Sequence, residues 1–417
     1  MKKHLLLCLF ATMTMGSVFT SCSDDDEKDA PVVCPIEKTT FNGSNGLELT
    51  YGGEALLGKQ VVFTPNVADH TKATLTLSGE DFDLMKQMVR TNGIVFNTPG
   101  VLPGSSETKL DIDLAIEGDK IAFKGESETE FCTFSYAGEG SKGSFKLNLN
   151  EVALKEKGLV GQWNLGQIEL DDWGMENYRP LHLEWDSEEQ FMIEMFPGVP
   201  AFPMPGKSIV GIVLDNLLLC DKVVGTDTTK VTVLNMLTDS FKDVRFAEDG
   251  NVTAQIVDFA NGQTEPTESP KNIAFYVVDK MPSASDRGSM RLFLNIETIN
   301  KIANANNTKS RTGFDLSGLL AMVNPLIQNG IPLTLISNEE GKLSIILDTA
   351  FLKPILTDVV LPLLDNEALV NGLLEMIKNN PDLGSFVPTA EAVLKQLPAV
   401  VNSTDKIEIG LNFTLNK

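Results

Sequence analysis

The stretch LDIDLAIE, residues 110–117, carries leucine or isoleucine at every second position and aspartate, alanine or glutamate between them. Successive side chains of a strand point to opposite faces, so this segment places one face in a core and the other in water. The stretch FKLNLN, residues 145–150, repeats the pattern. Further short runs of this kind, separated by glycine-containing turns, predict an antiparallel barrel or sandwich over residues 38–160.

Several segments of this region resemble a known group of proteins. TPGVLPGS at 98–105, with residues 109–116, 121–126 and 131–138, is similar to the calycin-like β-barrel domains of uncharacterised Bacteroidetes surface lipoproteins. EDGNVTA at 248–254 and SPKNIAFY at 269–276 resemble the same lipoproteins. The resemblance covers most of the chain and implies a fold and a cellular address. It brings no catalytic motif.

Residues 161–417 are predicted to form a second, α+β domain, because 417 residues exceed the size at which one core keeps growing. Strands are expected over 161–300. Helices and one hairpin are expected over 301–405, where Leu316, Leu319, Leu320 and Val323 follow helical spacing. The alternation from Ile407 to Leu415 predicts a closing strand over 406–415. The predicted fold class is therefore mainly β with a C-terminal α+β part.

The first 21 residues have the order of a secretory signal peptide. Lys2 and Lys3 precede an apolar run from Leu5 to Phe19, which is shorter than the roughly 20 residues of a membrane-spanning helix. The run ends in FTSC, residues 19–22, which resembles the lipobox of bacterial lipoproteins. This resemblance implies cleavage before Cys22 and acylation of its thiol, so that lipid anchors the protein to a membrane.

An acidic tether follows over residues 22–37. It begins with Ser23, Asp24, Asp25, Asp26 and Glu27. This tract resembles the signal that sends Bacteroidetes lipoproteins to the outer leaflet of the outer membrane, and it also suits a plain solvated linker, since like charges cannot pack. The expected location is the outer membrane, lipid-anchored and facing the cell exterior.

Composition excludes some partners and leaves the thiols open. The net charge of −23 argues against nucleic acid, because phosphate attracts basic proteins. After Cys8 and Cys22 are set aside, Cys34, Cys132 and Cys220 remain. A disulfide between Cys34 and Cys132 and three buried free thiols are both compatible with an exported protein.

The residues that enzymes and metal sites need are sparse. GEGSKG, residues 138–143, fits a dinucleotide-binding pattern but precedes a strand instead of a helix. Only His70 and His182 follow the signal peptide, and the chain lacks a G-x-S-x-G elbow. The acidic stretch 169–189 suits a solvated face, a calcium site or a carboxylate pair, the first being preferred. We therefore expect no enzyme, no metal and no cofactor.

Two features are candidates for binding. The three tryptophans, Trp163, Trp173 and Trp185, suit either sugar stacking or burial at the domain junction. The proline-rich segment 191–206 is a candidate apolar ligand site or a cover over a sheet edge. Its large apolar side chains are those of Phe191, Met192, Met195, Phe196, Phe202 and Met204.

These observations favour a non-enzymatic binding module for an apolar or amphipathic small ligand on a surface lipoprotein. The alternatives are a carbohydrate-binding surface protein that serves glycan uptake, and an adhesin or scaffold without a small ligand. Exposed tryptophans would favour sugar, and a cavity lined by aliphatic side chains would favour lipid.

Overall fold

The computed structural model describes residues 33–83, 95–174, 176–194, 198, 200–259, 262–305, 326, 328–337, 339, 341–379 and 383–416. The chain forms two units, residues 1–33 and residues 34–417. The signal peptide, Cys22 and the acidic tract from Ser23 to Glu27 lie outside the described residues, as does most of the helix predicted from Leu316 onward. The description below concerns the second unit.

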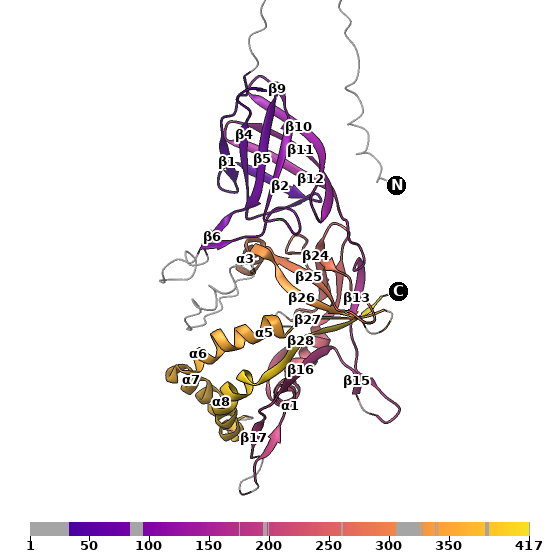
Figure 1. The fold of residues 1–417 in the computed structure, drawn as a ribbon, viewed down its shortest axis with the longest axis vertical. Helices are drawn as coiled ribbons and strands as arrows, with labels where there is room; N and C mark the ends of the chain where they lie inside the picture. Colours follow the sequence, from indigo (N-terminus) through magenta and orange to yellow (C-terminus); the bar gives the residue numbers. More distant parts are fainter. Residues whose placement is uncertain are drawn as a thin grey trace, which may run out of the picture. The chain divides into compact units, whose positions relative to one another are not determined.

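The N-terminal strands form two sheets that share one core (Figure 1). The first has the order β1 (Thr39–Asn42), β4 (Lys59–Pro65), β5 (Lys72–Gly79), β8 (Glu107–Asp113). The second has the order β3 (Glu54–Ala55), β2 (Leu47–Tyr51), β12 (Ser144–Leu154), β11 (Cys132–Ser141), β10 (Lys120–Glu128), β9 (Ala115–Glu117). A separate pair joins β6 (Asp81–Asp83) to β7 (Val95–Asn97). All pairs are antiparallel except β2 with β12, which run parallel.

The chain passes from one sheet to the other three times, between β1 and β2, between β3 and β4, and between β8 and β9. The segment 110–117 is β8 followed directly by β9, and only Leu114 separates the two strands. At the crossing between β1 and β2, Gly46 has a φ of +72° and a side chain would lie 2.1 Å from the carbonyl oxygen of Gly143. Glycine is therefore required there. The alternating apolar residues of both sheets are buried, as the sequence pattern predicts.

The second region contains a closed antiparallel barrel of eight strands, in which β28 pairs back with β13. In order around the ring these are β13 (Gly161–Leu165), β21 (Phe241–Phe246), β22 (Asn251–Ile256), β24 (Ala274–Lys280), β25 (Gly288–Leu294), β26 (Ile331–Ile336), β27 (Lys342–Leu347) and β28 (Thr404–Leu415). Closure leaves β13 and β28 without a free edge where they pair, which removes a template for aggregation. The short β23 (Thr267–Glu268) pairs with β22 outside the ring.

A long insertion separates β13 from β21. It begins with the hairpin β14 (Glu169–Leu170) and β15 (Glu176–Tyr178), and continues with β16 (Leu181–Ser187), which pairs with the first half of β28. The remaining elements are β17 (Phe191–Ile193), β18 (Phe202–Met204), α1 (Gly206–Ile212), the π-helical turn η2 (Val213–Leu217), β19 (Leu219–Val224), β20 (Asp227–Thr232) and α2 (Val233–Ser240). The Thr232 hydroxyl accepts a hydrogen bond from the Asn235 amide and caps α2.

Helices occupy two further connections. α3 (Ile296–Ala305) follows β25, and a helical group lies between β27 and β28 (Figure 1). The group consists of α5 (Thr349–Ile355), η4 (Leu356–Val360), α6 (Leu361–Leu364), α7 (Glu367–Asn379), η5 (Gly384–Phe386) and α8 (Val387–Asn402). The Asp348 carboxylate caps α5 by accepting from the Phe351 amide at 3.2 Å.

The two β regions share one continuous apolar core. The Tyr51 ring packs edge-on against Phe275 on β24 with centroids 5.0 Å apart, and its hydroxyl donates to the Asp249 carbonyl. The side-chain amide of Asn272 donates to the carbonyl of Ala55 at 3.2 Å. The outer wall of the closed barrel therefore packs against the first region.

The predicted fold class is confirmed, since the chain is mainly β with a barrel and a C-terminal helical and strand part. The predicted closing strand is β28, and the predicted hairpin is β26 with β27. The expectation for residues 38–160 was a barrel or a sandwich. The first region has the two-sheet arrangement, whereas hydrogen bonding closes the barrel over residues 161–415, because β28 returns to β13.

Candidate functional site: the lumen of the closed barrel

The inward face of the closed barrel is apolar. Along β28 the side chains of Ile409, Leu411 and Phe413 point inward, and the register places them opposite Leu347, Ile345 and Leu343 of β27. Because strand side chains alternate, the polar residues between them, such as Asn412, lie on the outer face. We call the enclosed space the lumen.

The lumen contains a cavity of about 440 Å³. Thirteen apolar side chains and Gly410 line it, and none of the described residues that line it is charged. The lining consists of Leu181, Phe241, Val244, Phe246, Val252, Met290, Leu292, Leu333, Ile345, Leu347, Ile409, Gly410, Leu411 and Phe413. Its volume falls within the roughly 300–1,000 Å³ that small-molecule sites occupy.

One end of the lumen is packed solid. Phe246 meets Tyr276 edge-on with centroids 4.9 Å apart, and the Tyr276 hydroxyl donates to the Ala247 carbonyl at 3.2 Å. Burial raises the pKa of Tyr276, so its hydroxyl stays protonated. Trp163 fills the space near the end of β28 and donates from Nε1 to the Leu159 carbonyl at 2.9 Å. These aromatic side chains form a floor.

Several side chains that line the lumen are half-buried, including those of Leu181, Phe241 and Leu347. β13 pairs with both β21 and β28 but ends at Leu165, and β16 resumes the pairing with β28 without pairing to β21. The wall is therefore interrupted between β16 and β21. We call this opening the rim.

Charged groups lie on the outer wall of the barrel. The carboxylate of Glu408 on β28 is 3% exposed, accepts a hydrogen bond from Arg287 at 2.6 Å and lies 3.0 Å from Nε2 of His182. Burial alone would raise the pKa of Glu408, but the hydrogen bonds with Arg287 and His182 outweigh it and lower that pKa. The network links the β24–β25 connection to β16 and β28 and so stabilises the wall.

The three tryptophans have different environments. Trp163 and Trp185 are buried, and the indole of Trp185 donates to the Thr404 hydroxyl at 2.9 Å. Trp173 is 89% exposed at the turn between β14 and β15. Among these candidates for sugar stacking, only Trp173 presents an accessible ring.

The proline-rich segment 191–206 folds as the hairpin β17–β18 beside α8. Phe191 and Met204 are buried in a second apolar cluster with Trp185 and Val401. The Met192 amide donates to the side chain of Gln396, while Met192 and Phe202 remain partly exposed. Met195 and Phe196 lie outside the described residues. None of the four described side chains lines the lumen.

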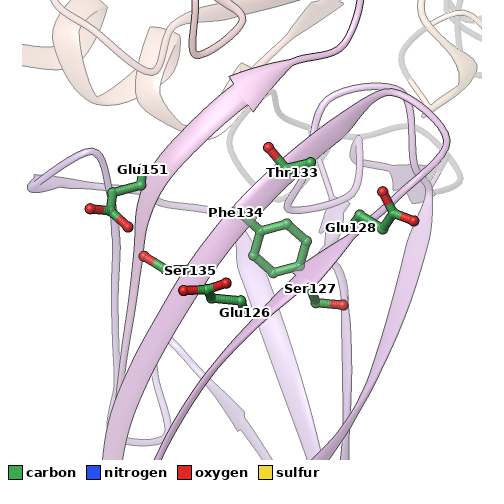
Figure 2. Close-up of a pocket in the computed structure, with 7 residues that line it drawn as sticks. All are labelled: Glu126, Ser127, Glu128, Thr133, Phe134, Ser135 and Glu151. Carbon is green, nitrogen blue, oxygen red and sulfur yellow. The ribbon is translucent and has the colours of Figure 1, made fainter.

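A second hollow, of about 530 Å³, lies on β10, β11 and β12 of the first region. Its carboxylates belong to Glu126, Glu128 and Glu151, and Figure 2 shows Glu128 on the other side of Phe134 from the remaining two. Within the described ranges, including the part of 169–189 that they cover, no group of three or more histidine, cysteine, aspartate or glutamate side chains converges as a metal site. The acidic hollow therefore carries no metal assignment.

The three cysteines beyond the acidic tract are free thiols, with Cys132 buried and Cys34 and Cys220 half-buried. The Cys132 thiol lies 3.4 Å from the Thr129 hydroxyl, and burial raises its pKa. Of the two alternatives left open by the sequence, the structure has free thiols instead of the Cys34–Cys132 disulfide.

Comparisons with family models, curated proteins and solved structures found no match to this chain. Among the described helices, none combines the length and apolar character needed to cross a bilayer. The lumen was not predicted at the level of residues. Its signal was the inward alternation of strands such as 407–415, but alternation alone does not distinguish a filled barrel from a hollow one.

Proposed function

We propose that this protein binds an apolar or amphipathic small ligand in the lumen of its closed barrel and performs no catalysis. The main support is the cavity of about 440 Å³, whose described lining side chains are all apolar. Removing apolar surface from water is favourable by about 25 cal/mol per Å². A hydrocarbon ligand that covers the half-buried leucine side chains of the lumen would therefore bind with a favourable free energy. A charged group without a partner would be excluded from the same space.

The proposal includes the cellular address. We infer that acyl chains on Cys22 hold the protein on the outer membrane, facing outward, and that Ser23, Asp24, Asp25, Asp26 and Glu27 direct it there. The support is the resemblance of these residues to the lipobox and export tract of Bacteroidetes surface lipoproteins. A lumen for apolar molecules suits a membrane-anchored protein, because its ligands would partition into the adjacent bilayer.

The test is a homologous series of primary alcohols with 8 to 16 carbons, titrated by calorimetry into the chain lacking residues 1–22. Each methylene buried in the lumen contributes about 0.8 kcal/mol, which corresponds to about a fourfold tighter Kd. We expect this increment until the chain fills the lumen, followed by a plateau. Absence of binding across the series would refute the proposal.

A lumen-filling variant places the binding in the barrel. Leu333→Trp adds an indole at a half-buried lining position and should weaken alcohol binding while leaving the melting temperature nearly unchanged. Leu170→Trp, at an exposed position on β14, is the matched control and should bind like the parent. Equal affinities for all three proteins would locate the ligand elsewhere.

Carbohydrate binding has one favourable observation, the exposed ring of Trp173. Indole faces stack on sugar rings, and Asp171 holds the turn by accepting from the Trp173 amide at 2.9 Å. A glycan-array signal that disappears in Trp173→Ala, together with no binding of alcohols, would replace the lumen proposal with the glycan function.

A further inference from the structure

A charged pair lies close to Leu181, a residue that lines the lumen. Arg179 immediately precedes Pro180 and Leu181, and Leu181 lines the cavity. The side-chain amide of Asn412 donates to the Arg179 carbonyl at 2.8 Å, and the Asn412 backbone amide donates to the Pro180 carbonyl at 2.8 Å. Asn412 stands between Leu411 and Phe413, which both line the cavity. The backbone of Arg179 is therefore fixed beside the lumen wall.

The partner of Arg179 comes from the helix that lies along β16. α1 packs along β16 and begins against Trp185, where a side chain on Gly206 would lie 2.4 Å from the indole. Trp185 and Leu181 are four residues apart on β16, so they share one face of the strand. α1 continues directly into η2, which extends the helix along that face toward Leu181.

The helix ends in an ion pair with Arg179. Nη2 of Arg179 donates to both carboxylate oxygens of Asp215 in η2, at 2.9 and 3.0 Å. Both side chains are partly exposed, at 27% and 32%. π-helical turns such as η2 occur frequently at functional sites.

We propose that Arg179 binds the carboxylate of a single-chain fatty acid whose hydrocarbon occupies the lumen, and that Asp215 holds Arg179 until the ligand displaces it. This inference rests on the proposed function. The apolar lining excludes the charged head, so the head stays at the rim. There Arg179 exchanges one carboxylate for another and remains paired throughout, which limits the cost of desolvation. The planar guanidinium group of Arg179 can donate two parallel hydrogen bonds to a carboxylate.

The experiment compares dodecanoate with 1-dodecanol at pH 7.5 in the chain lacking residues 1–22. Arg179→Gln should weaken dodecanoate binding by about tenfold or more, because a charge-assisted contact is lost, and should leave dodecanol binding within about twofold. Asp215→Asn should strengthen dodecanoate binding, since the competing carboxylate is removed, with no effect on dodecanol. The dodecanoate gain in Asp215→Asn keeps the test informative if Arg179→Gln folds poorly.

Arg291→Gln is the matched control. Arg291 pairs with Asp279 at nearly the same exposures, 27% and 33%, but on the outer wall above the Phe131 ring. Arg291→Gln should change neither the affinity for dodecanoate nor the affinity for dodecanol. Equal losses for acid and alcohol in Arg179→Gln, or unchanged dodecanoate binding in both rim variants, would overturn the inference while the lumen proposal stands. Failure of the parent protein to bind either molecule would overturn both.

Discussion

Replacing Lys59 on β4 by methionine should stabilise the protein at neutral pH and lose this effect as the pH rises. The Lys59 side chain is 3% exposed, and its ammonium group donates to the Pro99 carbonyl at 2.7 Å. Burial lowers the pKa of Lys59 from 10.5 to about 7. Methionine has a similar length and no charge, so Lys59→Met removes the buried amine and retains most of the packing.

The sign of the pH dependence follows from the number of protons that the folded and unfolded states bind. Between pH 7 and 10.5 the unfolded chain holds the Lys59 proton more tightly than the folded chain, so the free energy of unfolding of the parent rises with pH across this window. The full difference is about 5 kcal/mol, of which about 2 kcal/mol falls between pH 7 and 9. Loss of the hydrogen bond to Pro99 subtracts about 1–3 kcal/mol at any pH. Lys59→Met should therefore gain about 1–3 kcal/mol at pH 7 and about zero at pH 9.

Urea unfolding at pH 7 and pH 9 measures both quantities. Lys124→Met, the same substitution at an exposed position on β10, is the control and should show no gain that depends on pH. A Lys59→Met variant that is less stable than the parent by the same amount at both pH values would refute the reasoning. That result would mean that the amine is stabilised by its hydrogen bond more than it is penalised by burial.

Four further predictions are open to direct measurement. Metabolic labelling with an alkyne fatty acid should label the parent protein and should not label Cys22→Ser. Labelling of both proteins would refute lipid anchoring through Cys22. Added protease should digest the protein on intact cells, and alanine at positions 24–27 should abolish that digestion, whereas unchanged digestion would make the tract a linker. Glu408→Gln should cost about 1.5–3 kcal/mol at pH 7, because the charge-assisted hydrogen bond from Arg287 is lost. Since the folded-state pKa of Glu408 is lowered, its contribution is present above pH 4.5 and lost as the pH falls further, so unfolding at pH 7 and at pH 3.5 should show the difference shrinking. A fragment of residues 38–160 should unfold cooperatively by itself, because every described strand pair of this region is internal to it; a fragment without a cooperative transition would contradict this.

Local patterns predicted most of the elements. The alternation of 110–117 and 145–150 gave strands with the expected buried faces, and the helices expected over 301–405 include α7 and α8. The closure of the barrel was not predictable in this way. Pairing between Trp163 and Leu415 joins residues far apart in the chain, and any strand with an apolar face satisfies the same local pattern.

The candidate site was less accessible to sequence reasoning. Trp163, Trp173 and Trp185 are chemically alike, and only their places on strand or turn decide which one is exposed. The segment 191–206 was singled out for its apolar content, but that content covers α8 through Phe191 and Met204. The lining of the lumen depends on how the sizes of side chains from several strands add up across the ring, which no single stretch encodes.

The position of β28 has a consequence for biogenesis. β28 completes the ring and follows every other described strand along the chain. During synthesis, the edges of β13 and β27 that pair with β28 therefore stay open until β28 has emerged. Contacts between such distant residues form slowly, and unpaired edges persist in the meantime. A chaperone that shields strand edges would therefore act mainly on residues 161–403.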